Sequence, residues 1–209
     1  PLWAWAASIL GGLVLLCSLT FVILYSIYTP SVQPGTPIWN LNRQRSVTFT
    51  DPNGKIFATR GAMHGDRVSV KDMPPYLPAA FLAVEDRRFY DHWGVDLRGL
   101  ARAFISNIEA GDVVAGGSTI TQQLAKNVFL THQRTFGRKF EELFVAIWLE
   151  RHYSKDDILT YYLNRIYLGS GAYGVDAAAQ EYFGKSARDV TLAEAAMIAA
   201  LTRAPSVYS

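Results

Sequence analysis

The chain has 209 residues, of which 50% are hydrophobic and 18% are charged, and its formal net charge is +2. All 20 basic and 18 acidic residues lie at or after Arg43, where their density is close to the roughly 25% of ordinary globular domains. This distribution excludes a disordered protein, a multi-span membrane protein and a disulfide scaffold. It predicts an uncharged N-terminal segment joined to one soluble domain. The net charge is too small to indicate nucleic-acid binding, and we expect no nucleic-acid partner.

The first uncharged segment, residues 1–28, has the pattern of a transmembrane helix. From Trp3 to Tyr28 the residues are almost all apolar, and a helix of this length reaches about 39 Å, enough for a bilayer core of about 30 Å. Tryptophans at one end and tyrosines at the other resemble interfacial aromatic belts. A cleaved signal peptide is the alternative, although its apolar region is typically only about 7–15 residues long. A buried core helix is a further alternative.

The next two segments connect this helix to the rest of the chain. Residues 29–44 read as a stalk, because TPSVQPGT contains two prolines and a glycine that end the helix. In residues 45–78, the β-prone runs VTFT and KIFAT flank the turn signal DPNG, which predicts a β-hairpin just outside the membrane. Val68 to Pro78 is proline-rich and is expected to be a loop.

From residue 79 onward the apolar residues recur at helical spacing, so we expect a mainly α fold with one small β element. A Gly-rich segment, AGDVVAGGST, interrupts the series after the second helix. Capping patterns mark several helix ends. The expected helices are Ala79–Tyr90; a helix capped by Asp96 and running through Asn107, with Leu97, Leu100, Ala101, Phe104, Ile105 and Ile108 on its apolar side; Thr119–Phe129; Phe136–His152; a helix that begins with the Ser154/Asp157 pair and ends near Leu163; Gly174–Phe183, closed by Gly184; and a helix that begins with the Thr191/Glu194 pair and runs to Leu201.

Three segments carry side chains suited to chemistry. In AVEDRRFYDHWGVD, the carboxylates of Glu85 and Asp86 stand near an apolar helix end, where a general acid or base can be tuned; the alternative is that they pair with Arg87 and Arg88 on a solvated face. In GGSTITQQLAKN, hydroxyls and amides suit sugars or phosphates, or else form the polar face of a capped helix. In RTFGRKFEE, Arg134, Arg138 and Lys139 suit a diphosphate, while a surface salt bridge from Arg138 to Glu142 is the alternative.

The sequence gives no sign of a protein-held metal or of a common nucleotide or hydrolase motif. The four histidines show no ligand spacing, and there is no P-loop and no GxSxG elbow.

The order of the motifs is more specific than any one of them. In chain order they are Glu85-Asp86-x-x-Phe89-x-x-His92-x-Gly94, Gly117-Ser118-Thr119-Ile120-Thr121-Gln122-Gln123, Arg138-Lys139-x-x-Glu142, Ile158-Leu159-x-x-Tyr162-Leu163-Asn164 and Leu192-x-Glu194-Ala195-Ala196. The series resembles the peptidoglycan glycosyltransferase domain, glycosyltransferase family 51. The preceding DPNGKIFATRG is most similar to the N-terminal part of bifunctional class A penicillin-binding proteins. In such proteins the chain continues after a segment like RAPSVYS toward a transpeptidase domain, whose motifs are absent here.

The resemblance implies a bilobal, lysozyme-like domain over residues 79–209, held at the outer, periplasmic side of the bacterial cytoplasmic membrane by a single-pass helix. The implied reaction polymerises lipid II into glycan strands with inversion at the donor anomeric carbon and releases undecaprenyl diphosphate. Implied partners are lipid II, the growing glycan strand, the bilayer and other cell-wall synthesis proteins. A divalent cation, Mg²⁺ or Mn²⁺, is the implied cofactor. Phe104, Ile105, Ile108, Val113 and Val114 are expected either to dip into the bilayer or to form ordinary core.

The resemblance also assigns roles by position. Glu85 matches the general base that acts on the acceptor hydroxyl. Glu142 matches a second essential glutamate, which orients the basic groups or holds the cation near the diphosphate. The remaining matches are substrate-binding positions, with Asn164 supporting the cleft: Ser118, Thr119, Gln122, Gln123, Lys126, Arg134, Arg138, Lys139 and Asn164.

Two other functions fit part of the same pattern. A lysozyme-like hydrolase or lytic transglycosylase would cleave the same glycan with one acidic residue, but it has no need of the basic cluster near Glu142. An inactive, membrane-anchored docking module would need neither Glu85 nor Glu142.

Overall fold

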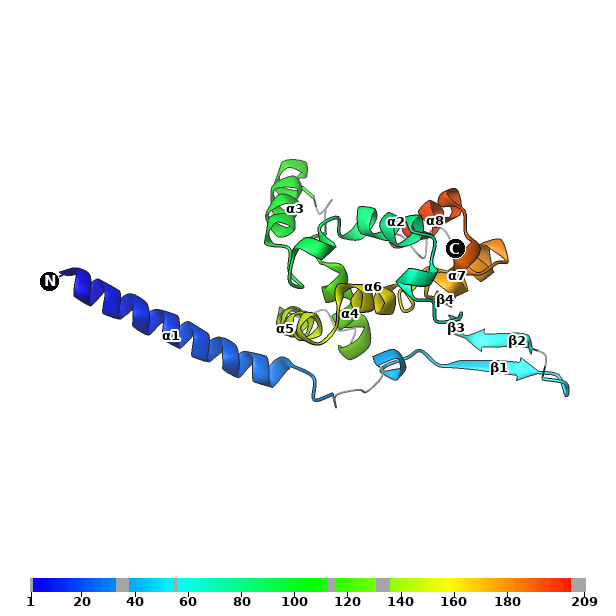
Figure 1. The fold of residues 1–209 in the computed structure, drawn as a ribbon, viewed down its shortest axis with the longest axis horizontal. Helices are drawn as coiled ribbons and strands as arrows, with labels where there is room; N and C mark the ends of the chain where they lie inside the picture. Colours follow the sequence, from blue (N-terminus) through cyan, green and yellow to red (C-terminus); the bar gives the residue numbers. More distant parts are fainter. Residues whose placement is uncertain (1, 33–37, 55, 113–115, 131–135, 204–209) are drawn as a thin grey trace.

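The computed structural model describes residues 2–32, 38–54, 56–112, 116–130 and 136–203. It begins with one long helix, α1 (Leu2–Tyr28), which projects from the domain (Figure 1). The part from Ala7 to Tyr28 is long and apolar enough to cross a membrane, with a mean hydropathy of 2.5 in its most apolar window. The C-terminal end of α1 packs on α5 (Phe136–His152) through the rings of Tyr28 and Phe144, whose centroids are 5.7 Å apart.

The β structure is small and lies in two places. Strands β1 (Ser46–Thr50) and β2 (Ile56–Gly61) form the predicted antiparallel hairpin, with a register irregularity between Phe49 and Thr50. The hairpin projects from the side of the domain away from α1, so it does not lie beside the expected membrane span (Figure 1). Strand β3 (Met63–His64) pairs in parallel with the short β4 (Ala172–Tyr173).

The rest of the described chain is mainly helical, as predicted. Short 3-10 turns lie at Ile38–Asn40 (η1), Val70–Asp72 (η2), Phe89–Asp91 (η3) and Ala187–Asp189 (η4). The predicted caps are present: Ser154 and Thr191 each form a capping box with the third helical residue, and Gly184 ends its helix in the left-handed conformation. Besides α5, the α-helices that follow α1 are α2 (Tyr76–Glu85), α3 (Leu97–Ala110), α4 (Ile120–Phe129), α6 (Lys155–Leu163), α7 (Val175–Phe183) and α8 (Leu192–Ala200).

Two predicted boundaries are wrong around α2. The expected loop at Val68–Pro78 contains η2 and the first turn of α2, since a proline is tolerated at the start of a helix. The helix expected to run to Tyr90 ends at Glu85. Asp86 leaves helical geometry, with φ −159° and ψ 78°, and its side chain bonds elsewhere in the fold.

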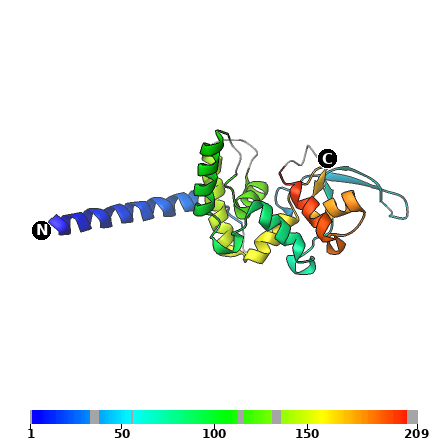
Figure 2. The ribbon, with the colours of Figure 1, turned by 90° about the horizontal axis from the view of Figure 1, so that it is seen from above.

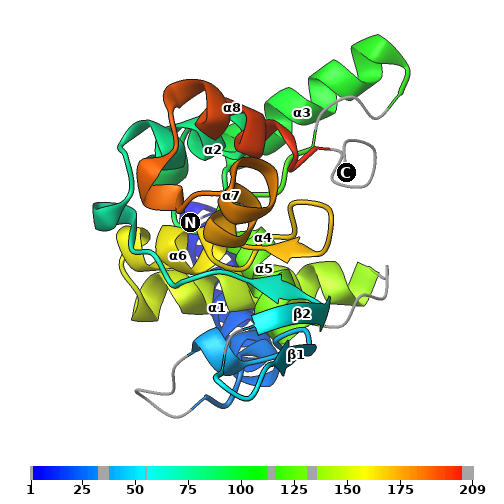
Figure 3. The same ribbon diagram turned by 90° about the vertical axis from the view of Figure 1, so that its right-hand side faces the viewer.

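The core joins the helices that carry the ordered motifs. α8 covers α2, with α7 beside α8, while α4 packs between α5 and α6 (Figure 3). Tyr162, Phe81, Leu124, Leu149 and Ile198 are among its fully buried side chains. The interior therefore fixes the end of α2 against α4 and α8, and this is where Glu85 lies.

Helix α3 is the exception, because its apolar face is not in the core. It stands on the side of the domain that faces α1 (Figures 1 and 2), and Phe104 and Ile108 are 66% and 64% exposed. Core packing is therefore the wrong alternative for this face. Asp96 is the N-cap residue of α3, as expected, but its carboxylate accepts a bond from Arg88 at 3.0 Å and makes no capping bond, and the helix continues past Asn107 to Ala110.

Candidate active site

Glu85 is the last residue of α2 and borders a cavity of about 310 Å³. The cavity lies where the end of α2 faces α3 and the start of α4, as a bilobal arrangement predicts. Both carboxylate oxygens of Glu85 accept hydrogen bonds. Oε2 accepts from the Gln123 amide at 2.8 Å, and Oε1 accepts from the Thr202 hydroxyl. Two donors from different helical segments therefore hold this carboxylate in one orientation at the cavity wall.

A third side chain supports this arrangement from the core. The Tyr162 hydroxyl donates to Oε1 of Gln123 at 3.3 Å, which fixes the Gln123 amide with its NH₂ group toward Glu85. Burial raises the pKa of the Tyr162 hydroxyl, and the charges of Glu85 and Asp86 raise it further. Tyr162 therefore stays a neutral donor at every pH at which the protein works.

Asp86, next to Glu85 in sequence, has a different environment. It is buried, its two oxygens lie 3.0 Å from Nε2 of His92, and Oδ2 also accepts the backbone N–H of Ile120 at 3.1 Å. Asp86 thus joins the end of α2 to the beginning of α4. The alternative pairing of Glu85 and Asp86 with Arg87 and Arg88 is wrong for the described contacts: Arg87 donates to a backbone carbonyl and Arg88 pairs with Asp96.

Glu142 on α5 is the centre of the basic cluster. Glu142 is only 3% exposed, and its carboxylate accepts hydrogen bonds from Arg138 at 2.8 Å and from Lys139. Lys139 also donates to the Ser118 hydroxyl at 2.8 Å, which ties the segment before α4 to α5. An ordinary surface salt bridge is therefore the wrong description of this cluster. Two cations on one buried carboxylate leave a local excess of positive charge.

Some polar residues of the GGSTITQQLAKN segment cap a helix, and others lie at the cavity. Thr119 and Gln122 are buried and form the capping box of α4, and the Thr119 hydroxyl also lies 2.6 Å from the Gly94 carbonyl. Gln122 therefore holds the helix start. Ser118 and Thr119 border the cavity, and Gln123 reaches Glu85. Only part of this predicted set is brought to the cavity wall.

Of the remaining predicted residues, two do not line the cavity and three lie outside the described residues. Lys126 is half-buried, one turn beyond Gln123 on the same side of α4. Asn164 uses its side chain on backbone: its NH₂ group donates to the carbonyls of Val68 and Thr160, and its oxygen accepts the Val68 N–H. It supports the fold behind the cleft. Arg134, Val113 and Val114 lie outside the described residues.

The structure adds cavity residues that the sequence analysis did not assign. Thr202 bonds Glu85, and the exposed Arg102 and Arg203 line the same cavity. No local pattern marks Thr202, because its partner lies 117 positions earlier. The sequence did indicate Asp86, because it follows Glu85 directly in the first motif.

The described residues do not form a ready metal site. No group of three His, Cys, Asp or Glu side chains among them is placed to hold an ion. Both oxygens of Glu142 are already engaged by Arg138 and Lys139, so an ion would have to displace a cation to reach them. The donor set therefore does not fit a metal that the protein holds by itself.

Comparison with known families agrees with this geometry. A family model described as Transglycosylase matches residues 53–209. The chain belongs to the transglycosylase family. This confirms the resemblance drawn from the ordered motifs, and the domain is a peptidoglycan glycosyltransferase domain. The match begins within the hairpin, earlier than position 79.

Similar proteins support the same assignment. The transglycosylase chain is 49% identical over 164 residues to penicillin-binding protein 1F of Bacillus subtilis, covering 78% of this chain and 23% of that protein. It is 50% identical over 163 residues to penicillin-binding protein 1A of Neisseria flavescens, covering 78% and 20%, and 51% identical over 159 residues to penicillin-binding protein 1A of Aquifex aeolicus, covering 76% and 22%. The chain thus spans about a fifth of the length of these curated relatives.

Proposed function

We propose that this chain polymerises lipid II, with Glu85 as the general base. The observation that carries the proposal is the placement of Glu85: a carboxylate held by two hydrogen-bond donors at the wall of a cavity that basic side chains line. Glu85 takes the proton of the acceptor's N-acetylglucosamine 4-hydroxyl as that oxygen attacks the anomeric carbon of the donor's N-acetylmuramic acid. The new C–O bond forms with inversion. The bond to the diphosphate oxygen breaks, and the electron pair leaves with undecaprenyl diphosphate.

The basic residues stabilise the leaving group. Negative charge grows on the diphosphate as the bond breaks, and fixed positive groups lower the energy of that state. Arg138 and Lys139 are held in place by Glu142, and Arg102 and Arg203 add charge at the cavity. Lys126 on α4 is a further basic residue, one turn beyond Gln123. A guanidinium group suits a phosphate especially well, because it can donate two parallel hydrogen bonds.

The membrane placement follows from two apolar surfaces. α1 has the length and composition of a membrane span, and the exposed apolar face of α3 lies on the side of the domain that faces α1 (Figure 2). We infer that α1 crosses the bacterial cytoplasmic membrane, that the domain lies on the periplasmic side and that α3 dips into the outer leaflet. Donor and product both carry a lipid, so this placement brings the cavity to the level of the substrate's headgroup.

We propose that the divalent cation arrives with the substrate. The donor set around Glu142 does not fit a protein-bound ion, whereas a diphosphate binds Mg²⁺ or Mn²⁺ by itself. The cation then offsets negative charge on the diphosphate, and the chain's own contribution is the Arg138–Lys139–Glu142 cluster. Other cell-wall synthesis proteins remain predicted partners.

The test incubates the purified, membrane-reconstituted protein with labelled lipid II and Mg²⁺. We expect long glycan strands from the wild type and none from Glu85→Gln, which keeps the hydrogen-bonding shape but removes the base. Glu181→Gln is the matched control, because Glu181 is an exposed residue on α7. Its activity should equal that of the wild type.

The outcomes separate the three candidate functions. Unchanged lipid II with folded wild-type protein would contradict the polymerase function and leave the docking module. Release of anhydro-sugars or reducing sugars from mature glycan, without polymer, would assign the site to a lytic enzyme or a hydrolase.

A further inference from the structure

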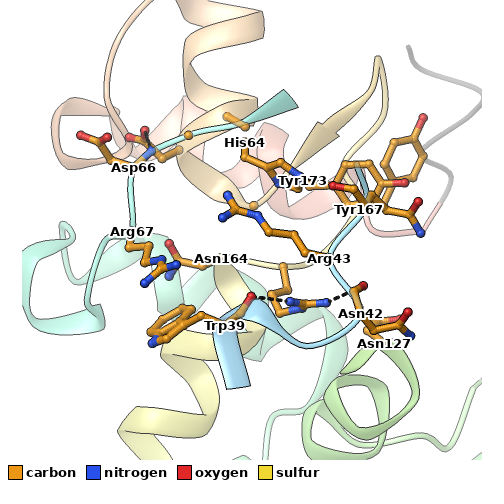
Figure 4. Close-up of a pocket in the computed structure, with 16 residues that line it drawn as sticks. Trp39, Asn42, Arg43, His64, Asp66, Arg67, Asn127, Asn164, Tyr167 and Tyr173 are labelled. Atoms are coloured by element: carbon orange, nitrogen blue, oxygen red, sulfur yellow. Dashed lines mark hydrogen bonds between the residues drawn. The ribbon is translucent and has the colours of Figure 1, made fainter. Parts of the chain in front are cut away.

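A second cavity, of about 270 Å³, lies apart from the Glu85 site and shares no lining residue with it (Figure 4). Its wall is made by the C-terminal part of the predicted stalk, residues 39–44, by β3 and the residues that follow it, by the turn after α6, and by the start of α7. Asn127 at the end of α4 contributes a further side chain. Glu85 and Glu142 do not line this cavity, whereas Asn164, one of the predicted substrate-binding positions, does.

The cavity wall is a built structure. Arg165 donates to the carbonyls of Trp39 and Asn42, at 2.9 and 3.1 Å, and so holds this part of the predicted stalk against the domain (Figure 4). Ile38 is fully buried beside it. The Trp39 ring packs on Tyr161 with 4.2 Å between centroids. These contacts fix the position of the cavity wall.

The charge around the cavity is positive. Arg43, Arg67 and Arg165 all line it. Of the two carboxylates in the wall, Asp176 is 1% exposed and accepts bonds from Ser186, Gln180 and two backbone N–H groups. The other, Asp66, is exposed and lies 3.9 Å from a guanidinium nitrogen of Arg188. With three arginines and two carboxylates, the lining has a formal charge of +1, counting His64 as neutral.

The pKa values of two groups in the wall, His64 and Arg165, are lowered. Burial lowers the pKa of His64, and the charges of Arg43 and Arg165 lower it further against the opposing bond to the Gln44 carbonyl. Burial also lowers the pKa of Arg165, with an added contribution from Arg43. In both groups burial is the largest cause, and the charges of the neighbouring arginines add to it.

The rest of the wall suits an organic anion. The rings of Trp39, Tyr167 and Tyr173 supply flat apolar surface, and the amides of Gln44 and Asn127 supply donors and acceptors (Figure 4). Guanidinium groups beside rings and amides suit a carboxylate on a peptide or sugar. The volume fits one or two residues of a peptide.

Helix α4 connects the Glu85 site to this second cavity. Asn127 is four residues after Gln123, so the two side chains lie on one side of the helix about 6 Å apart along its axis. The wall elements β3 and β4 also lie away from α1 (Figure 1), which disfavours a membrane-lipid headgroup as the ligand. We propose that this cavity binds a carboxylate of the peptide carried by the glycan strand, an inference that rests on the proposed function.

The test measures binding to the full chain in detergent micelles by calorimetry or NMR. The probes are a soluble N-acetylglucosaminyl–N-acetylmuramyl pentapeptide with free carboxylates, and the same compound with its carboxylates amidated. We expect the free acid to bind about tenfold more tightly. Arg43→Gln should remove this preference and Arg43→Lys should keep part of it. Arg60→Gln, at an exposed arginine on β2, is the matched control and should behave as wild type.

Each outcome bears on one proposal. Equal binding of the two probes, or a preference that survives Arg43→Gln, would overturn the peptide site. Displacement of the free acid by inorganic diphosphate at equal concentration would reassign the cavity to phosphate and also overturn it. A carboxylate preference that is lost in Arg43→Gln, in a protein that does not polymerise lipid II, would support the cavity's ligand chemistry and refute the proposed function alone.

Discussion

The Thr202 hydroxyl lies between Oε1 of Glu85 and the carbonyl of Ala199, within hydrogen-bonding distance of both. A hydroxyl has one hydrogen and two lone pairs. Thr202 can therefore donate to the Glu85 carboxylate, or accept from its protonated form while donating to Ala199. A residue 117 positions from Glu85 thus provides a partner for the carboxyl group before and after proton transfer.

Removing this hydroxyl should slow polymerisation without unfolding the domain. Thr202→Val keeps the branched shape and deletes the hydroxyl group. Because hydrogen bonds to charged groups contribute about 1.5–3 kcal/mol, we expect the rate to fall by about tenfold or more. Thr202→Ser should retain most of the activity. Steady-state rates with lipid II and melting temperatures check this. Wild-type activity in Thr202→Val would show that the contact has no role in catalysis.

Variants of Arg138 and Glu142 should change the stability and the activity by different amounts. Arg138→Ala removes one of two partners from a buried carboxylate, so we expect a loss of about 1–3 kcal/mol in the free energy of unfolding together with lost activity. In Arg138→Ala/Glu142→Gln the buried charge is gone, and most of the stability should return. The activity should not return, because the diphosphate still lacks its guanidinium group. Recovery of both quantities together would make Arg138 purely structural.

The cation should bind with substrate and not before it. Without lipid II, Mg²⁺ should leave the melting temperature unchanged, because only an ion that binds the native state stabilises it. EDTA should slow polymerisation. Calorimetric titration of Mg²⁺ into the substrate-free protein checks the first point. Saturable binding that disappears in Glu142→Gln would contradict it and place the ion on the protein.

The apolar face of α3 should contact lipid. In vesicles that contain a photoactivatable phospholipid, we expect label on peptides from α3. Phe104→Ser/Ile108→Ser should lose most of it, since more than 60% of each of these residues is exposed and available to contact lipid, and burying such apolar surface is favourable. Leu192 and Met197 on α8 are an internal control, because they are similarly exposed but lie on another surface. Equal labelling of α3 and α8 would refute a specific membrane contact.

Local sequence signals predicted much of the helical framework. The capping boxes at Ser154 and Thr191 appear as expected, because each depends on residues three apart in one chain segment. The errors occur where a partner outside the helix competes for a side chain at the helix end. The Asp96 side chain pairs with Arg88 and makes no capping bond to α3, and Asp86 turns out of α2 toward His92.

The uncharged apolar segment, the mainly helical domain and the ordered motifs that place the chain in its family are all readable from residues close together along the chain. Which side chains meet depends on the tertiary structure. In the folded chain, Gln123 and Thr202 donate hydrogen bonds to Glu85, and Gln122 holds the start of α4. The apolar face of α3 is exposed, and a second, positively charged cavity lies around Arg165. Such contacts depend on how helices pack over long sequence separations, and no local periodicity encodes them.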